Sequence, residues 1–400
     1  MGRLKALEFV ENEDCLFMNI TSDRTGKIVK TLTGYEAFIP NPLPPVPEVK
    51  IDQEMFFLLS AADRKLGRLD GITRVLPNPD LFLAMYVQKE AILSSQIEGT
   101  QASLVDVLDA SSDTEKRKPD VEDVVNYVKA MNYGLDRLKT LPLSLRLIRE
   151  IHRILLQGVR GSDRNPGEFR TTQNWIGVQG CTLATATFVP PPVEEMKEGM
   201  GALEKFFYDD TAYIPPLIKI AMIHAQFETI HPFLDGNGRV GRLLIAFWLC
   251  QQEILSKPLL YLSFYFKQNR TEYYDRLMAV RLHGDWENWI KFFLKGVESV
   301  SEEATNSATA ILALKDRYSE ALSKSAGNNN HQRLLDYLFE KPSITRKDVI
   351  MQLDVSSPTA GDLLDTFCSL GILTDVTPDK QRNKRYYFKD YLDILEKGTE

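Results

Sequence analysis

The chain has 400 residues, 44% of them hydrophobic and 26% charged, which is enough chain to bury a large core without disulfides or metals. It carries 48 Lys and Arg against 55 Asp and Glu, and this net charge of -7 disfavours a protein that mainly coats nucleic acid or an anionic membrane. The four cysteines lie far apart and form no CxxC pair, so no zinc ribbon or disulfide framework is indicated, and we expect a cytoplasmic location.

Residues 1–54 are predicted to form an N-terminal arm. They are strand-like and run into the proline-rich segment PNPLPPVPEVK, in which proline fixes φ and blocks helix formation. Charged residues interrupt the opening sequence MGRLKALEFVENEDC, so it has no apolar core of a signal peptide. We expect the arm to lie extended on another surface of the protein.

Apolar residues recur at helical spacing from residue 52 onward, which predicts a mainly α fold. Residues 159–192 break this pattern because they are rich in Gly, Thr, Asn and Pro, and we expect a loop and a hairpin with strands at Trp175–Val178 and Thr187–Val189. The longest apolar run, Leu243–Cys250, is far shorter than the roughly 20 residues of a membrane-spanning helix, so no membrane contact is expected. The predicted helices cover residues 52–67, 79–98, 119–138, 143–158, 193–208, 215–229, 238–253, 270–282 and 285–325.

A polar segment, SAGNNN, interrupts the helical pattern at residues 325–330 and predicts a domain boundary. After it, residues 329–400 show the order helix, helix, turn, helix, hairpin, which is the layout of a winged helix-turn-helix domain. The hairpin tip is basic, whereas the third helix carries Asp362 and Asp365 and almost no cation. DNA binding is therefore an alternative that we do not favour, and a protein–protein or homodimer contact is at least as well supported.

The segment HPFLDGNGRVGR, residues 231–242, lies between two helical patterns and is predicted to be a loop that ends at a helix N-terminus. The first N–H groups of a helix lack intrahelical partners and carry the positive end of the helix dipole. Glycines on both sides of Asn237 let the backbone approach a ligand closely. A phosphate or another anion is the natural ligand of such a loop.

Four side chains of this loop are candidates for chemistry on a bound phosphate. Arg239 and Arg242 lie three positions apart near the helix start, where two guanidiniums oppose the dipole unless an anion compensates them. Asp235 is suited to Mg²⁺, which takes one or two carboxylates together with phosphate oxygens. His231 is suited to general-base work near neutral pH. A metal hydrolase built on His224 and His231 is disfavoured, because the HExxH spacing and a third ligand are missing.

Taken singly, a loop histidine or a GNG turn has an ordinary structural explanation, but the ordered set resembles the Fic family of nucleotidyltransferases. The family motif is HPFx(D/E)GNGRxxR, and residues 231–242 match it at every specified position. The resemblance covers about residues 55–325 and, more loosely, both flanking units. It implies a helical bundle with a β-hairpin flap, and transfer of AMP from ATP to a Ser, Thr or Tyr hydroxyl of a protein. Further similar segments lie at 166–170, 175–177, 188–191, 273–274 and 285–289.

The resemblance also implies a role for each residue of the loop. His231 would take the proton from the target hydroxyl, and Asp235 would bind the Mg²⁺ cofactor between the α- and β-phosphates. Such transfer depends mostly on positioning and on charge stabilisation. The residues implied to hold the nucleotide phosphates are Gly236, Asn237, Gly238, Arg239 and Arg242.

Two other segments would complete the implied site. The flap, at Thr187, Phe188 and Val189, would align the target by main-chain pairing, with an ordinary surface hairpin as the alternative. Tyr273 and Tyr274 would pack near the adenine, with core packing as an equally supported alternative.

A second motif, SSQIEG at residues 94–99, ends an apolar helix that we predict over residues 79–99. Glu98 is then a carboxylate at a helix C-terminus, where the dipole disfavours negative charge by about 0.3–1 kcal/mol, and Gly99 suits the helix cap. A simply solvated carboxylate is the alternative. Ser94, Glu98 and Gly99 resemble the inhibitory motif (S/T)xxxE(G/N) of Fic proteins. This implies that Glu98 pairs with Arg242 in the place of the γ-phosphate and autoinhibits the enzyme.

The sequence thus predicts three units and one preferred function. The units are the arm 1–54, a Fic domain 55–325 that includes the inhibitory helix 79–99, and a winged-helix domain 329–400. The rival functions are a nucleotide-sensing transcriptional regulator, and a Fic enzyme that uses another donor or removes AMP. The expected partners are ATP, a hydroxyl-bearing protein target (which includes the chain itself) and a second copy of the chain.

Overall fold

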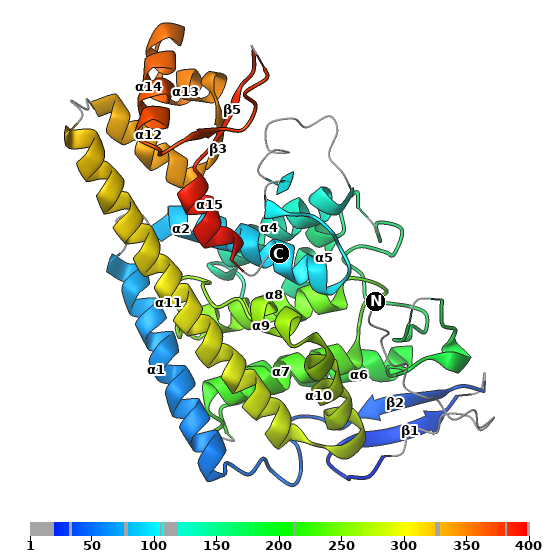
Figure 1. Ribbon diagram of the computed structural model, residues 1–400. Coiled ribbons are helices and arrows are strands. Elements are labelled where there is room, and N and C mark those ends of the chain that lie inside the picture. The colour runs from blue at the N-terminus through cyan, green and yellow to red at the C-terminus, as the bar shows by residue number, and fades with distance from the viewer. Residues whose placement is uncertain are drawn as a thin grey trace, which may run out of the picture.

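The computed structural model shows a mainly helical protein (Figure 1). Cys15, much of the predicted arm and the centre of the predicted boundary, 325–328, lie outside the described residues. Within the described part of the chain, no helix is both long and apolar enough to cross a membrane. The described residues are 20–31, 34–75, 79–104, 106–107, 119–159, 161–178, 180–211, 213–324, 329–380 and 382–397.

Two helices, α7 (Pro216–Ile230) and α8 (Asn237–Gln251), form the centre of the molecule. Every residue of α7 after its first is buried, and α8 is buried along most of its length, because other helices surround the pair. The candidate loop connects α7 to α8 and therefore rests on a rigid base. The surrounding helices are α2 (Pro79–Ile97), α4 (Pro119–Leu138), α5 (Leu145–Leu155), α6 (Val193–Phe207), α10 (Arg270–His283) and α11 (Trp286–Lys324).

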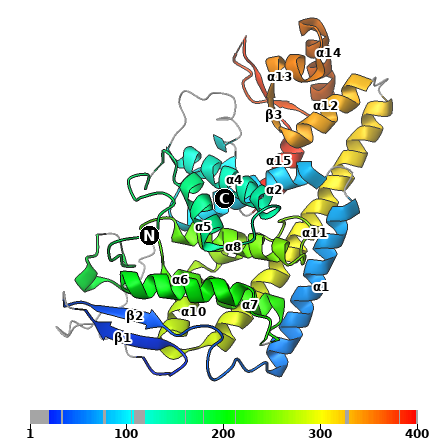
Figure 2. The same cartoon turned by 180° about the vertical axis from the view of Figure 1, so that it is seen from behind.

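Helices α1 (Gln53–Val75) and α11 lie side by side along one flank of the molecule, as Figures 1 and 2 show. They run in the same direction, since Lys291 near the start of α11 pairs with Asp52, while Lys65 pairs with Glu302 farther along both helices. The long α11 extends beyond the helical core and reaches the C-terminal part of the chain.

The described part of the N-terminal arm contains a hairpin. Strand β1 (Gly26–Lys30) pairs antiparallel with β2 (Glu36–Pro40). The Phe38 N–H donates to the Val189 carbonyl at 3.0 Å, and the Phe38 ring lies 5.7 Å from the Phe188 ring. The arm is therefore strand-like, as predicted, and it lies against the flap.

Residues 329–397, which are orange to red in Figure 1, form a small α/β unit at the end of α11. Its strands form one antiparallel sheet in the order β3-β5-β4. Helices α12 and α15 pack against α2 as well as α11, and an ion pair of 2.8 Å joins Lys315 of α11 to Asp336 of α12. The elements are α12 (Asn329–Glu340), β3 (Ser343–Thr345), α13 (Arg346–Leu353), α14 (Ser357–Ser369), β4 (Thr374–Asp375), β5 (Arg385–Tyr387) and α15 (Lys389–Glu396).

The helices of the structure differ from the predicted helices in three places. Helix α1 continues to Val75, well beyond the predicted end at residue 67. Helix α9 (Ser263–Gln268) and helix α15 were not predicted, because elements this short show too little periodicity. The flap has one antiparallel bridge, Ile176 with Phe188, instead of two strands. The prolines that follow Val189 have no N–H to continue the pairing.

Candidate active site

The candidate loop joins α7 to α8 through two left-handed residues. His231 ends α7 with a φ of 51°, and Gly236 starts α8 with a φ of 79°. Glycine adopts this conformation without strain, whereas a histidine needs surrounding contacts to hold it there. The predicted loop that ends at a helix N-terminus is confirmed.

Two buried amides hold the loop. Asn237 accepts from the Phe233 N–H at 2.9 Å and donates to the Phe233 carbonyl at 2.8 Å. Asn174 donates to the carbonyls of His231 at 3.1 Å and of Phe233 at 2.8 Å. The place of Asn237 in the anion hole stays a prediction. Its side chain is used up in shaping the loop, and only its main-chain N–H is left for a ligand.

The His231 imidazole has one nitrogen fixed by the protein. Its Nδ1 lies 3.3 Å from the Glu228 carbonyl, which can only accept, so Nδ1 carries the proton and Nε2 holds the lone pair. Burial and then the Arg281 guanidinium lower the pKa of His231 to about 3. The ring is therefore neutral at physiological pH, which is the state that a general base requires.

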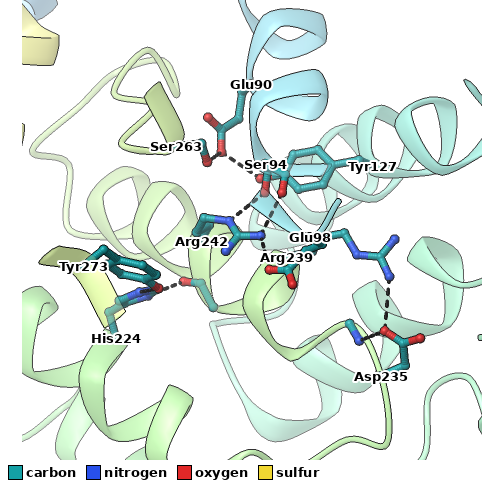
Figure 3. Close-up of polar contacts among 12 residues, drawn as sticks. Glu90, Ser94, Glu98, Tyr127, His224, Asp235, Arg239, Arg242, Ser263 and Tyr273 are labelled. Carbon is teal, nitrogen blue, oxygen red and sulfur yellow. Dashed lines mark hydrogen bonds and ion pairs between the residues drawn. The ribbon is translucent and has the colours of Figure 1, made fainter. Parts of the chain in front are cut away.

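Arg242, in the first turns of α8, reaches helix α2 (Figure 3). Its Nε donates to Ser94 Oγ at 2.8 Å, and its Nη2 donates to the Ser94 carbonyl at 2.9 Å and to Glu98 Oε1 at 2.8 Å. The Arg242 side chain is 2% exposed and that of Glu98 is 38% exposed. The structure thus brings together three residues that lie up to 148 positions apart.

The Glu98 carboxylate also covers the start of α8. A Cβ placed on Gly238 would lie 2.3 Å from Glu98 Oε1, so only glycine allows this close approach. Burial raises the pKa of Glu98, but the Arg242 guanidinium more than offsets this, and the pKa lies below its ordinary value. Glu98 is therefore a carboxylate anion at the positive end of a helix, where an anionic ligand is expected.

The end of α2 fixes the position of Glu98. The Thr100 N–H donates to the Ser95 carbonyl and the Gly99 N–H to the Gln96 carbonyl, each at 3.1 Å, which is a Schellman cap. Gly99 has a φ of +97°, as this cap requires. Farther up the helix, buried Glu90 accepts from Tyr127 at 2.9 Å and from Ser263 at 2.5 Å, which ties α2 to the core.

We expect Gly99→Ala to loosen this cap, because a left-handed alanine costs about 1 kcal/mol or more. Hydrogen exchange of the amides of residues 98–100 should accelerate. The matched control is Gly201→Ala in α6, where nothing lies near the new Cβ and a helical alanine is favoured. Equal protection of residues 98–100 in the two variants would contradict the assigned cap.

Asp235 and Arg239 form a charged corner beside the loop. Arg239 lies 3.5 Å from Asp235 and 3.4 Å from Asp123 of α4. The Gly236 N–H donates to Asp235 Oδ1 at 2.6 Å, while Oδ2 faces Gly161, and the Asp235 side chain is 34% exposed. One accessible carboxylate next to an anion site fits the donor set that Mg²⁺ takes in proteins.

Sequence reasoning missed His152 of α5. Its Nδ1 accepts from the Gly167 N–H at 2.8 Å, so its Nε2 carries the proton and donates to the Asp235 carbonyl at 3.0 Å. The ring stacks on Phe233 with centroids 3.7 Å apart. Burial lowers the pKa of His152 to about 4, which keeps this support of the loop neutral.

The two predicted adenine residues differ in their surroundings. Tyr273 is buried, its ring stacks on Phe266, and its hydroxyl bonds to His224 Nε2 at 2.9 Å, so core packing describes it (Figure 3). This is the core-packing alternative, and a contact of Tyr273 with adenine stays untested. Tyr274 is 39% exposed, and its ring lies 5.1 Å from that of Tyr273.

The predicted flap residues lie together, but they differ in how many main-chain hydrogen bonds they form. Phe188 exchanges both of its main-chain hydrogen bonds with Ile176, and the Val189 carbonyl accepts from Phe38. Thr187 is exposed and lies at the open side of the bridge. Among Thr187, Phe188 and Val189, both main-chain groups of Thr187 and the N–H of Val189 form no main-chain hydrogen bond within the described residues.

Two family models match the region that contains these residues. The Fic/DOC family N-terminal model matches residues 56–136, and the Fic/DOC family model matches residues 142–249. The first covers the end of α2 with Glu98, and the second covers the loop with His231 and Arg242.

Curated relatives carry the same family name. A protein named Protein adenylyltransferase Fic from Nematostella vectensis is 28% identical over 274 residues, which are 66% of this chain and 59% of the relative. One of the same name from Aedes aegypti is 32% identical over 151 residues, or 38% of this chain and 27% of the relative. The chain thus matches less than two thirds of the length of these relatives.

Solved structures share the fold. A Fic family protein from Desulfovibrio desulfuricans G20 has a TM-score of 0.54 at 19% identity, and the match covers 85% of this chain and 97% of that one. A Fic domain containing signaling protein from Bacteroides thetaiotaomicron VPI-5482 has a TM-score of 0.50 at 19% identity, covering 62% and 95%. With its motif, its loop geometry and both family regions, the chain belongs to the Fic/DOC family.

Proposed function

We propose that the chain is a protein adenylyltransferase and that Glu98 autoinhibits it. The observation that carries the proposal is the buried Arg242 guanidinium at the start of α8, which forms an ion pair with Glu98. A buried cation beside a helix N-terminus makes a phosphate site. Glu98 takes the place of a phosphate there, and relatives named protein adenylyltransferases favour ATP as the donor of an AMP group.

The loop residues divide the work on ATP between them. Arg239 and Arg242 contact the distal phosphates, and the main-chain N–H groups of Asn237 and Gly238 face the phosphate oxygens. Asp235 would hold Mg²⁺, and this ion would supply charge neutralisation in phosphoryl-type transfer. Glu98 opposes this arrangement because its carboxylate and a γ-phosphate cannot both contact Arg242.

His231 activates the acceptor. As the hydroxyl oxygen of the target bonds to the α-phosphorus, its proton passes to His231 Nε2. The bond from the α-phosphorus to the oxygen of the β-phosphate breaks, and pyrophosphate leaves with the electron pair. The open main chain of Thr187 pairs with the target segment and places its hydroxyl near His231.

Labelled ATP tests this function directly. We would incubate the wild type and Glu98→Gly with Mg²⁺ and ATP that is labelled at the α-phosphate, and in parallel with ATP labelled at the γ-phosphate. Label on protein from the α-phosphate alone is the expected result. Label from the γ-phosphate would show a kinase, and no label with ATP bound would show another donor or a sensor that only binds nucleotide.

The C-terminal unit gives no specific support to the rival regulator. Helix α14, which would be the recognition helix of a winged-helix domain, has no Lys or Arg, and its Asp362 and Asp365 are exposed. Lys384 of the basic tip pairs with Asp375 at 2.8 Å. DNA binding is therefore not part of the proposal, while a protein target and self-association are.

The pH dependence of the Glu98–Arg242 pair follows from the lowered pKa of Glu98. A carboxylate whose folded pKa lies below its unfolded value stabilises the fold above the unfolded pKa, and this contribution is lost as the pH falls through the folded pKa. We expect the difference in unfolding free energy between wild type and Glu98→Gln to shrink as the pH falls from about 4.5 through the folded pKa of Glu98. Burial raises the pKa of Glu228 to about 7 and Glu98 contributes to this rise, so the difference also changes between about pH 6 and 8. Urea unfolding at several pH values measures this; a difference that grew in acid would contradict the pair.

A further inference from the structure

Arg281 of α10 is a buried cation that lies outside the motifs described above. It is 5% exposed, and the Glu228 carboxylate acts on its charge electrostatically without a direct ion pair among the described residues. Its Nη2 donates to the Glu228 carbonyl at 3.0 Å, and its Nε donates to Thr229 Oγ1 at 3.2 Å. Burying a charge is costly, so a guanidinium spent on neutral acceptors needs a reason at this position.

One of these acceptors also orients the proposed base. The Glu228 carbonyl takes the hydrogen bond of His231 Nδ1 as well as that of Arg281 Nη2. A carbonyl oxygen has two lone pairs and can serve both donors. Arg281 therefore fixes the group that determines which nitrogen of His231 carries the proton and where Nε2 points.

The other face of the guanidinium holds the flap. The Arg281 Cζ lies 4.2 Å from the centroid of the Phe188 ring, within the range of a cation–π contact. Phe188 is buried between Arg281 and Phe38, and its main chain forms the bridge to Ile176. Arg281 thus contacts the Glu228 carbonyl, which orients His231, on one side and Phe188 of the flap on the other.

We propose that Arg281 is a positioning residue that sets the distance between His231 and the flap, so that the acceptor hydroxyl aligned at Thr187 meets the Nε2 lone pair. The inference rests on the proposed transfer reaction. A misplacement of about 1 Å between reacting groups costs about 10²-fold in rate, and one side chain that touches both parts can prevent it.

The charge of Arg281 has a second effect on the same base. Arg281 from α10, Arg170 from the segment before the flap and Glu98 from α2 are the charged groups that act on His231. Arg170 donates to the His231 carbonyl at 3.1 Å. The two cations oppose protonation of His231 and Glu98 favours it, so loss of Arg281 raises the pKa of His231 toward its ordinary value.

The test uses three full-length variants in the Glu98→Gly background. Arg281→Gln removes the charge, Arg281→Lys keeps it without the planar fork, and Arg276→Gln removes a partly exposed α10 arginine as the matched control. For Arg281→Gln we expect kcat to fall about 10²-fold with KM for ATP unchanged. Arg281→Lys should recover part of kcat, and Arg276→Gln should behave as its parent.

The imidazole nitrogen shifts of His231, followed by NMR against pH in the absence of ATP, give a readout that does not depend on activity. We assign the signal by its absence in His231→Ala. The pKa of His231 should rise by about one unit or more in Arg281→Gln and stay low in Arg281→Lys. An unchanged pKa together with an unchanged kcat would overturn the role of Arg281.

A second variant covers the case in which Arg281→Gln does not fold. Thr229→Val removes the acceptor of Arg281 Nε with little change in shape, and we expect kcat to fall while KM for ATP stays constant. A parallel rise in KM would point to general damage and count against the inference. If Glu98→Gly transfers no AMP at all, the proposed function fails, and the NMR titration still decides whether Arg281 controls His231.

Discussion

Glu98→Gly should raise AMP transfer by about 30- to 150-fold at limiting ATP. Before a γ-phosphate can contact Arg242, the wild type must break its ion pair of 2.8 Å with Glu98. Breaking a fully buried pair costs about 3–5 kcal/mol, and the 38% exposure of Glu98 reduces this to about 2–3 kcal/mol. Since each 1.4 kcal/mol is about tenfold, removal of the carboxylate gives the stated gain.

The measurement is the initial rate of label transfer from ATP labelled at the α-phosphate. Glu98→Gln separates charge from flexibility, because it keeps the length of the side chain and should retain most of the gain. Glu272→Gln, which removes an exposed carboxylate paired with Arg276, is the matched control and should leave the rate unchanged. If Glu98→Gly and Glu272→Gln both transfer AMP at the wild-type rate, Glu98 does not autoinhibit the enzyme.

His231→Ala should lower transfer by about 10²- to 10⁴-fold in the Glu98→Gly background, which is the usual contribution of a general base. Its Nε2 carries the lone pair that accepts the target proton, since Nδ1 is bound to the Glu228 carbonyl. ATP affinity should change little, because the proposed phosphate contacts come from α8 and not from His231.

Parallel measurements of label transfer and of ATP binding by calorimetry separate these two effects. His283→Ala is the matched control, because His283 is exposed and bonds only to Thr21 among the hydrogen bonds of the described residues. A His231→Ala chain that still transfers AMP at the parental rate would move the role of base to another group. Lost ATP binding would instead make His231 a structural part of the loop.

The loop and its helix could be predicted from the sequence because they are local. The apolar periodicity of α7 and α8 and the glycines between them lie within one short stretch of chain. The contact of Glu98 with Arg242 spans 144 positions, and no spacing rule reaches that far. It was predicted through the resemblance to a family motif, and the structure brings the two side chains together.

Other parts of the site could not be predicted, since a single residue type carries several uses. An asparagine at position 237 looks the same in the sequence whether its amide binds a ligand or closes the loop onto Phe233. Tyr273 is aromatic both as a nucleotide contact and as a core residue. His152 and Arg281 bond to main-chain carbonyls, which every residue has, so no partner residue type marks them in the sequence.

Helix α2 contacts both the C-terminal unit and the candidate site. Helices α12 and α15 pack on it, and its C-terminal end covers the start of α8. If α2 couples binding at these two places, thermodynamic linkage makes the coupling reciprocal. A ligand of the C-terminal unit that shifted α12 against α2 would change the affinity of the phosphate site by some factor. ATP, by displacing Glu98, would then change the affinity for that ligand by the same factor.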